Sequence, residues 1–356
     1  MLDRYFEMKK HWIGLLAAFV PIFAGAQVEK PISETPKPVS DYVRFLKAET
    51  ADQSDLLQTA IVRFERKSDG KVVDLVAVVH IGDQRYYDQI DLVLKNYDAV
   101  LYELVGGEFS QRAVNPPAEE MGGVRGMQGI AKSLLGLEFQ LDSVDYEAKN
   151  FIHADVLWDE FNQLMVAKNQ SMATMFSRAM ELASKGEIEG MPTSEKDSNA
   201  MLISLIGSLA SGDSAALKRT IAPFLAEAET LITQLEGEDG TVLVSERNKV
   251  VMKKLKSEIG AKKSKLAIFY GAGHMPDLED RLIADGFTKK NFSWATAWEI
   301  APPKKGSGSA SSQFFQNLLS EDTSMLDFLQ SFGNALNEAN QSQKPAPPAE
   351  AEAKEK

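Results

Sequence analysis

The sequence of 356 residues contains no cysteine. The chain can therefore form no disulfide and carry no lipid-modified cysteine, so its stability must come from an ordinary hydrophobic core. It also lacks an excess of basic residues, since 39 Lys and Arg stand against 51 Asp and Glu, a net charge of -12. A chain of this charge repels phosphate backbones, and the composition therefore predicts that nucleic acid is not a partner.

Long apolar runs are also rare, and the one clear example lies near the amino terminus. Residues 12–23 are apolar, follow a basic stretch at 9–11 and precede the small residues at 24–26. This order is typical of a secretory signal peptide, and the run is short for a membrane span. The sequence therefore predicts a signal peptide at 1–26, a secreted or periplasmic protein, and no integral membrane segment after cleavage. The alternative is that the apolar run is a membrane anchor that is not cleaved from the protein.

The pattern after residue 41 is that of an α/β domain. Two β-rich runs, at 59–64 and 72–79, flank a turn signal at 68–70 and predict a hairpin. The second run is apolar on both faces, as in an interior strand. Apolar residues at helical spacing over 87–97 and a short strand at 99–102 follow. This order of strand, helix and strand predicts a right-handed crossover and parallel pairing.

A helical insertion is predicted at about 156–235, where Met, Ala, Leu and Ser recur at helical spacing. Beyond it, a helix at 245–259, a strand at 266–270, a helix at 276–284 and a strand at 292–300 are expected. The insertion separates these elements from the first strands. The predicted fold class is therefore α/β, with a mixed and largely parallel sheet that a helical insertion splits.

The ends of the chain show no pattern that could build a core. Residues 27–40 read as an extended lead-in to the α/β domain, which we place at 41–301. Residues 302–356 read as a linker, an amphipathic segment at 314–336 and a disordered tail. The amphipathic segment is a candidate contact for a protein partner.

Histidine is scarce, with four in the chain, and two of them occupy equivalent positions. His80 and His274 each end a buried strand and stand three residues before an aspartate, Asp83 or Asp277, that opens a helix. Each aspartate is expected to cap its helix by accepting free backbone N–H groups. Since open α/β sheets bind ligands at the carboxyl ends of their strands, both histidines are expected at one crevice.

Glu103 follows the strand at 99–102, so its carboxylate is expected at the same crevice. Two imidazoles and a carboxylate suit a divalent transition metal that keeps open positions for water and substrate. Such a metal lowers the pKa of bound water and polarises a carbonyl, which is hydrolytic chemistry. The alternative is three strand-end residues satisfied by ordinary hydrogen bonds.

Four segments resemble the TraB/PrgY/GumN family, which includes the TIKI metalloproteases: His80-Ile81-Gly82-Asp83, Tyr102-Glu103-Leu104, Glu246-Arg247-Asn248 and Gly271-Ala272-Gly273-His274. The similarity is scattered from about residue 55 to 300. The family's hallmark is a pair of Gly-x-x-His motifs with a glutamate and an arginine, in a fold related to haem-binding ChaN-like proteins and erythromycin esterases. The second motif is intact here, whereas Ala77 stands where the first has glycine.

The resemblance implies roles for four residues. His80 and His274 would be metal ligands, Glu103 a ligand or general base, and Arg247 an anchor for a carboxylate or an oxyanion. The metal would be Mn, Co or Zn. The predicted function is an exported metal-dependent hydrolase, with a peptidase as its leading form, acting on a peptide or a small amide or ester.

Other interpretations stay open. Arg247 lies on a charged helix, where an arginine is often solvated. Asp155 is expected to cap a helix at 156–161. The chain is alternatively a non-catalytic binder of haem or metal, with Tyr86, Tyr87 and His80 as ligands, or a regulator that sequesters a peptide in the same cleft.

Overall fold

A computed structural model describes residues 42–109, 134–171, 212–236 and 240–303, with single positions between 174 and 208. The predicted signal peptide and lead-in, the linker after Pro303, the amphipathic segment and the tail lie outside the described residues. Within the described ranges, no helix is long and apolar enough to cross a membrane.

The predicted hairpin is confirmed. β2 (Asp55–Arg66) and β3 (Lys71–Val78) pair antiparallel, with Ile61 opposite Val76. Gly70 takes the left-handed φ of 70° in the turn between them, a conformation that suits glycine. β2 also pairs antiparallel with β1 (Val43–Leu46) and β9 (Thr288–Ile300), and so forms the antiparallel half of the sheet.

The other half of the sheet is parallel, in the order β3, β8 (Lys265–Gly271), β5 (Ala99–Tyr102) and β7 (Phe151–His153). The predicted α/β class with a mixed sheet is thus confirmed. β3 and β5 are parallel as expected, but they are not paired. β8 lies between them, and its residues after Lys265 are all buried, as in a strand that is covered on both faces.

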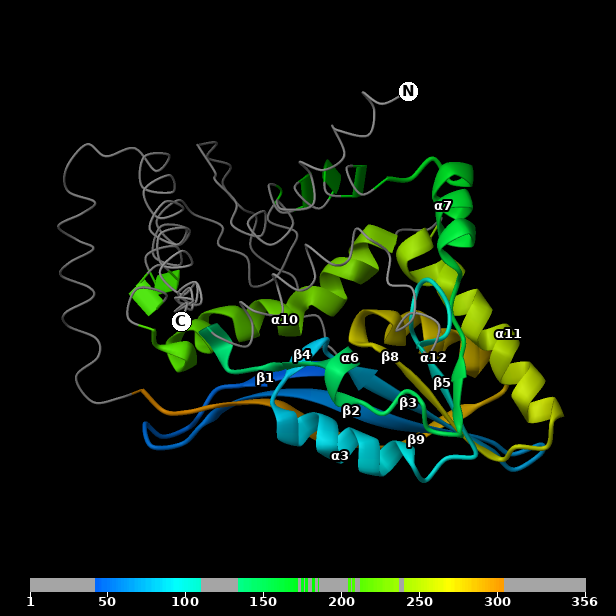
Figure 1. The fold of residues 1–356 in the computed structure, drawn as a ribbon, viewed down its shortest axis with the longest axis horizontal. Coiled ribbons are helices and arrows are strands. Elements are labelled where there is room, and N and C mark those ends of the chain that lie inside the picture. The colour runs from blue at the N-terminus through cyan, green and yellow to red at the C-terminus, as the bar shows by residue number, and fades with distance from the viewer. Residues whose placement is uncertain are drawn as a thin grey trace, which may run out of the picture. The chain divides into compact units, whose positions relative to one another are not determined.

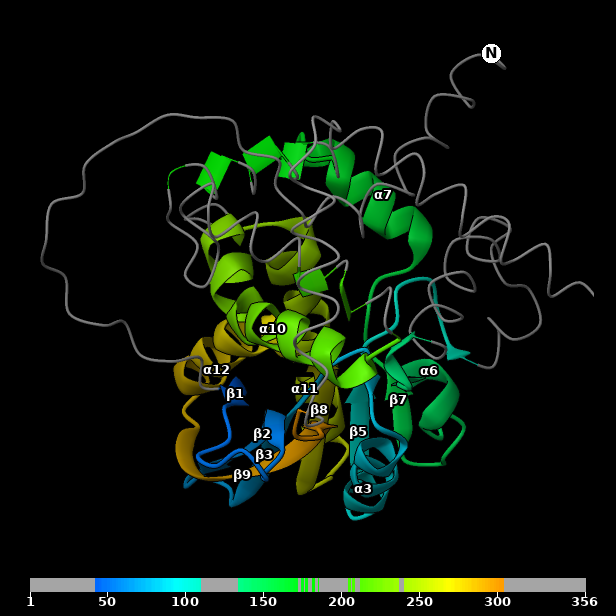
Figure 2. The ribbon, with the colours of Figure 1, turned by 90° about the vertical axis from the view of Figure 1, so that its left-hand side faces the viewer.

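Helices cover both faces of the sheet (Figures 1 and 2). α3 (Gln84–Leu94) lies on one face and buries four side chains, Tyr86, Tyr87, Ile90 and Leu94. α11 (Arg247–Gly260) and α12 (Met275–Ala284) lie on the other face. The helices predicted at 245–259 and 276–284 are these two, and α11 follows a short π-helical turn, η2 (Val242–Glu246).

The helical insertion is confirmed where the structure describes it. It contains α7 (Trp158–Ala167) and α10 (Ser214–Glu236), and most of the chain between these helices lies outside the described residues. α10 contacts β1 and the turn η3 (Ala272–His274), which directly follows β8. The insertion therefore packs against a loop at the carboxyl edge of the sheet.

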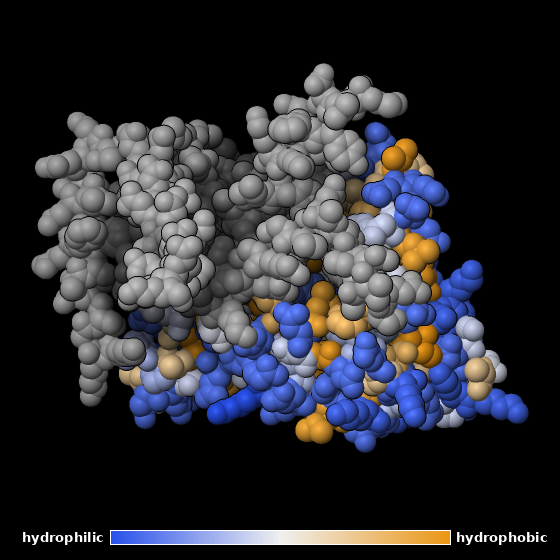
Figure 3. Space-filling model, viewed as in Figure 1, coloured by the Kyte–Doolittle hydropathy of each residue, from blue (hydrophilic) through white to orange (hydrophobic). Residues whose placement is uncertain are grey.

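A small second sheet lies at the same edge. β4 (Ile81–Gly82), just after β3, pairs antiparallel with β6 (Glu138–Phe139), and α6 (Gln140–Ser143) follows directly. This pairing holds Gln140 beside the end of β3. In the view of Figure 3, the described surface is mostly hydrophilic and apolar residues occur in small groups.

Candidate functional site

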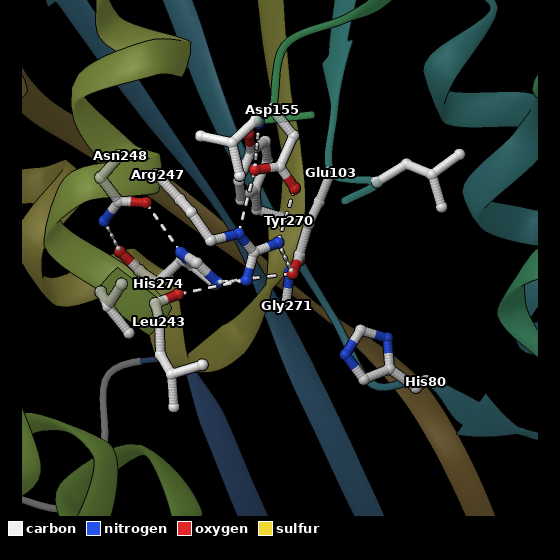
Figure 4. Close-up of polar contacts among 12 residues, drawn as sticks. His80, Glu103, Asp155, Leu243, Arg247, Asn248, Tyr270, Gly271 and His274 are labelled. Carbon is white, nitrogen blue, oxygen red and sulfur yellow. Dashed lines mark hydrogen bonds and ion pairs between the residues drawn. The ribbon is translucent and has the colours of Figure 1, made fainter. Parts of the chain in front are cut away.

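The three residues predicted to form a site lie at the carboxyl edge of the parallel strands (Figure 4). His80 stands two residues after β3, Glu103 directly after β5, and His274 in the turn that follows β8. Because β8 lies between β3 and β5, its last residue, Gly271, separates Glu103 from His80. The fold thus brings the three positions to one edge, but the surroundings of the three side chains differ.

Glu103 is a buried and ionised carboxylate. One oxygen, Oε1, accepts a hydrogen bond of 2.6 Å from Nη2 of Arg247, and Oε2 accepts one of 2.6 Å from the backbone N–H of Gly271. Burial opposes the charge, but the Arg247 guanidinium holds the pKa of the Glu103 carboxyl well below its ordinary value. Charge-assisted hydrogen bonds of this kind are the strong ones in proteins. A carboxylate with so low a pKa is a weak base.

Arg247 is the cation of the site. Its Nε and Nη2 donate to the two carboxylate oxygens of Asp155 at 2.9 and 2.6 Å, a bidentate pair. Its Nη1 donates to the carbonyl of Leu243 at 3.1 Å and faces Nε2 of His274 at 3.2 Å. With the bond to Glu103, all five N–H groups of the guanidinium have partners. The solvated-face interpretation of Arg247 is therefore wrong.

Asp155 also differs from its predicted role. Its side chain is 0% exposed and binds Arg247, and α7 begins only at Trp158 with Leu157 at its N-cap. The expected cap is therefore wrong, because the carboxylate compensates a buried cation instead. Its place two residues beyond β7 was the available clue, since His80 stands at the same distance from β3.

His274 uses both of its ring nitrogens inside the protein. Asn248 donates from Nδ2 to the His274 carbonyl at 3.0 Å and to Asp277 at 2.6 Å, so its Oδ1 accepts from Nδ1 of His274 at 2.8 Å. Because a guanidinium can only donate, Nε2 of His274 accepts from Arg247. Oε1 of Glu103 lies 3.4 Å from the same nitrogen. Asn248 was not predicted as a site residue, although it belongs to the segment that carried the family resemblance.

The predicted helix caps are wrong at both histidine motifs. Asp83 precedes α3, but its carboxylate binds Nζ of Lys218 at 3.1 Å and the N–H of Glu299 at 2.7 Å. Asp277 binds Asn248 and Arg281. Each carboxylate links its loop to another element or turn, and α3 and α12 receive no capping bond from a side chain.

His80 is the exposed member of the site. Its Nδ1 lies 2.9 Å from Oε1 of Gln140, whose Nε2 donates to the hydroxyl of Tyr146 at 2.7 Å. The amide oxygen of Gln140 can only accept, so Nδ1 of His80 donates to it, and in the neutral imidazole Nε2 is the nitrogen with the lone pair. Gln140 was missed from the sequence, because nothing local marks a residue that meets His80 from 60 positions away.

A side chain on Gly271 would lie close to both His80 and Glu103. A Cβ at this position would stand 3.2 Å from Oε2 of Glu103 and 3.6 Å from Nε2 of His80. In Figure 4 the imidazole of His80 turns toward Glu103 across this position. The two side chains therefore face one small polar region above Gly271.

The predicted metal ligands do not fit a three-ligand site in this arrangement. Among the residues that the structure describes, no three His, Cys, Asp or Glu side chains are grouped to hold a metal ion. The reason lies in the donors, because both nitrogens of His274 are occupied by Asn248 and Arg247. Metal binding at this site stays a prediction, and we derive no step from it.

The haem alternative loses two of its three proposed ligands. Tyr86 and Tyr87 are 1% and 0% exposed, and burial raises the pKa of both hydroxyls. The Tyr86 hydroxyl bonds to Thr59 at 2.9 Å, and that of Tyr87 donates to the carbonyl of Val79 at 2.9 Å. Both tyrosines therefore belong to the core under α3.

No family model, curated protein or solved structure matches this chain. The resemblance to the TraB/PrgY/GumN family therefore stays a prediction, and the function must be argued from the geometry of the site.

Proposed function

We propose that this protein is a hydrolase of amide or ester bonds whose reaction centre is the space above Gly271. The observation that carries the proposal is the pairing of two unlike groups across that glycine. Nε2 of His80 and Oε2 of Glu103 stand 3.6 and 3.2 Å from the place that a Cβ of Gly271 would take. One group is exposed and keeps a lone pair, and the other is buried and ionised.

His80 is the general base of the proposed reaction. Its Nδ1 is held by Gln140, so Nε2 is free to accept a proton from a water molecule that attacks the substrate carbonyl. The same nitrogen then returns the proton to the leaving nitrogen or oxygen, which completes the addition of water across the bond. A positioned base of this kind contributes roughly 10²–10⁴-fold to a rate.

Glu103 orients the water and stabilises the imidazolium. Its low pKa makes it a poor base, which favours His80 over Glu103 for proton transfer. Its Oε2 already accepts from Gly271 and has a second lone pair for the attacking water. A fixed carboxylate beside a histidine that gains charge lowers the free energy of that charged state.

Sequence features support the same reaction class and a finer description of the fold. The strand-end motifs and the helical insertion favour a fold of the TIKI/TraB/ChaN-like type, and the predicted signal peptide favours export. The substrate class proposed is a peptide or a small amide or ester. A metal-dependent form would require Nε2 of His274 to be free, and this nitrogen accepts from Arg247.

The proposal is tested by turnover of nitrophenyl esters and of a peptide library, with and without chelator. We expect His80→Ala to lose about 10²-fold or more in kcat and to remain folded, because His80 is exposed. His153→Ala is the matched control, since His153 donates to the carbonyl of Leu104 outside the space.

Full activity of His80→Ala on every substrate that the wild type cleaves would refute the role of His80. A wild type that binds peptides and cleaves none would instead favour the peptide-sequestering alternative.

A further inference from the structure

The carboxyl edge of the sheet contains a cluster of buried groups that would attract a cation. The carboxylates of Glu103 and Asp155 and the Nε2 lone pair of His274 converge there from three different strand ends (Figure 4). Carboxylates and imidazoles are donors that divalent metals use, although these three are not grouped as ligands of one ion in the part of the chain that the structure describes. A protein cation, Arg247, already lies among them.

We propose that Arg247 is the resident cation of this cluster and closes His274 to metal ions. Its guanidinium reaches Glu103 at 2.6 Å, Asp155 at 2.6 and 2.9 Å and His274 at 3.2 Å. This assignment rests on the geometry of the cluster and does not depend on the proposed hydrolase activity.

Burial makes the guanidinium difficult to displace. The side chains of Arg247, Glu103 and His274 are 9%, 11% and 8% exposed, and that of Asp155 is not exposed. Removing Arg247 would leave two carboxylates buried without a counter-charge, which is strongly unfavourable. A metal would therefore have to replace all of the arginine's bonds before it could reach Nε2 of His274.

The position of Arg247 in the chain also holds its guanidinium in place. It is the first residue of α11, and its Nη1 donates to the carbonyl of Leu243 within the preceding turn. All five N–H groups have partners in the protein, so none is left to hold a substrate carboxylate or an oxyanion. The role inferred for Arg247 thus differs from the substrate anchor that the resemblance implied.

Zinc binding by the wild type and three variants tests the inference. Arg247→Ala should gain one zinc ion per chain, because removal of the guanidinium frees Nε2 of His274 and leaves the carboxylates of Glu103 and Asp155 without a counter-charge. Arg247→Ala/His274→Ala should lose this zinc. In the wild type, zinc content after dialysis should be the same as in His274→Ala. Zinc should also raise the melting temperature of Arg247→Ala, since a ligand that binds only the folded state stabilises it.

Arg63→Ala is the matched control. Arg63 forms a bidentate pair with buried Asp74 in the β2–β3 hairpin, and no histidine lies beside this pair among the contacts that the structure describes. This variant should lose stability but gain no zinc. A gain equal to that of Arg247→Ala would show that any uncompensated carboxylate suffices, and would overturn the inference.

If Arg247→Ala does not fold even with zinc, NMR of the wild-type protein tests the inference instead. In protein labelled with ¹⁵N-histidine, the ring nitrogens of His274 should report a proton on Nδ1 and should not shift when zinc is added. A shift of Nε2 of His274 on zinc binding, or wild-type zinc that is lost in His274→Ala, would overturn the inference. Neither readout involves turnover, so failure of the hydrolase proposal would leave this result intact.

Discussion

Glu103 keeps its charge although only 11% of its side chain is exposed. Burial alone would favour the neutral acid, but Arg247 and the N–H of Gly271 both bond to the carboxylate. This arrangement makes the residue a fixed negative group beside His80. At the residue scale, the charge of Glu103 is therefore maintained by its neighbours, and its removal has consequences that can be measured.

A pH dependence of stability follows from this charge. An unfolded glutamate has a pKa of about 4.3, and the folded value of Glu103 is lower, so the folded protein binds fewer protons. The stabilisation is complete above about pH 4.3 and is lost as the pH falls through the folded value. Urea unfolding at neutral pH and near pH 3.5 should show a larger loss for the wild type than for Glu103→Gln.

Glu147→Gln is the control for this experiment, because Glu147 is exposed. Glu147→Gln should lose as much stability at low pH as the wild type does. At neutral pH, Glu103→Gln should be less stable by roughly 1–3 kcal/mol, the cost of leaving a buried donor poorly paired. Equal acid sensitivity of the wild type and Glu103→Gln would contradict the charge assigned to this residue.

The elements themselves could be predicted where the signal is local. The hairpin of β2 and β3, the helices α3 and α12 and the strand β8 each follow from apolar periodicity and turn residues in one short window. The position of β8 between β3 and β5 did not follow, because strand order depends on pairing between distant segments, as in the pairs Ala99–Leu266 and Val72–Lys265.

The site could be predicted only in part, because the local sequence indicates strand ends but not the distant residues that bond to them. His80, Glu103 and His274 were identifiable because each closely follows a strand. Their partners were not, since Arg247 meets Asp155 across 92 positions and His80 meets Gln140 across 60. A strand end can be recognised locally, whereas a hydrogen-bond partner is chosen by the tertiary fold.

Gly271 ends β8, and its missing side chain predicts an effect on activity. Its φ is -53°, which any residue adopts, so Gly271→Ala should fold. The added Cβ would stand 3.2 Å from Oε2 of Glu103 and would fill the proposed reaction space. We expect a loss of turnover in a variant that remains folded.

Gly260→Ala is the matched control, since nothing lies within 4 Å of a Cβ at that position. It should retain activity and gain roughly 0.4–1 kcal/mol of stability through a less flexible unfolded chain. Normal turnover by a folded Gly271→Ala would place the reaction elsewhere.

At the scale of the molecule, the helical insertion limits access to the site. α10 packs against the turn after β8, where a Cβ on Gly273 would overlap Ile232. The ion pair between Lys218 and Asp83 fixes the same helix to the loop after β3. The His274 side of the site is thereby covered in the part of the chain that the structure describes, whereas His80 is exposed. Substrate should therefore approach from the His80 side.

The central claim is that His80 and Glu103 serve one reaction step, and a double-mutant cycle tests it most directly. The measurement is kcat/KM of the wild type, His80→Ala, Glu103→Gln and the double variant, on a substrate that the wild type cleaves and at a temperature where all four are folded. Residues that act as a unit show non-additive losses, so the double variant should be no slower than the slower single variant. Losses that multiply in the double variant would show that the two side chains act independently, and would contradict this account.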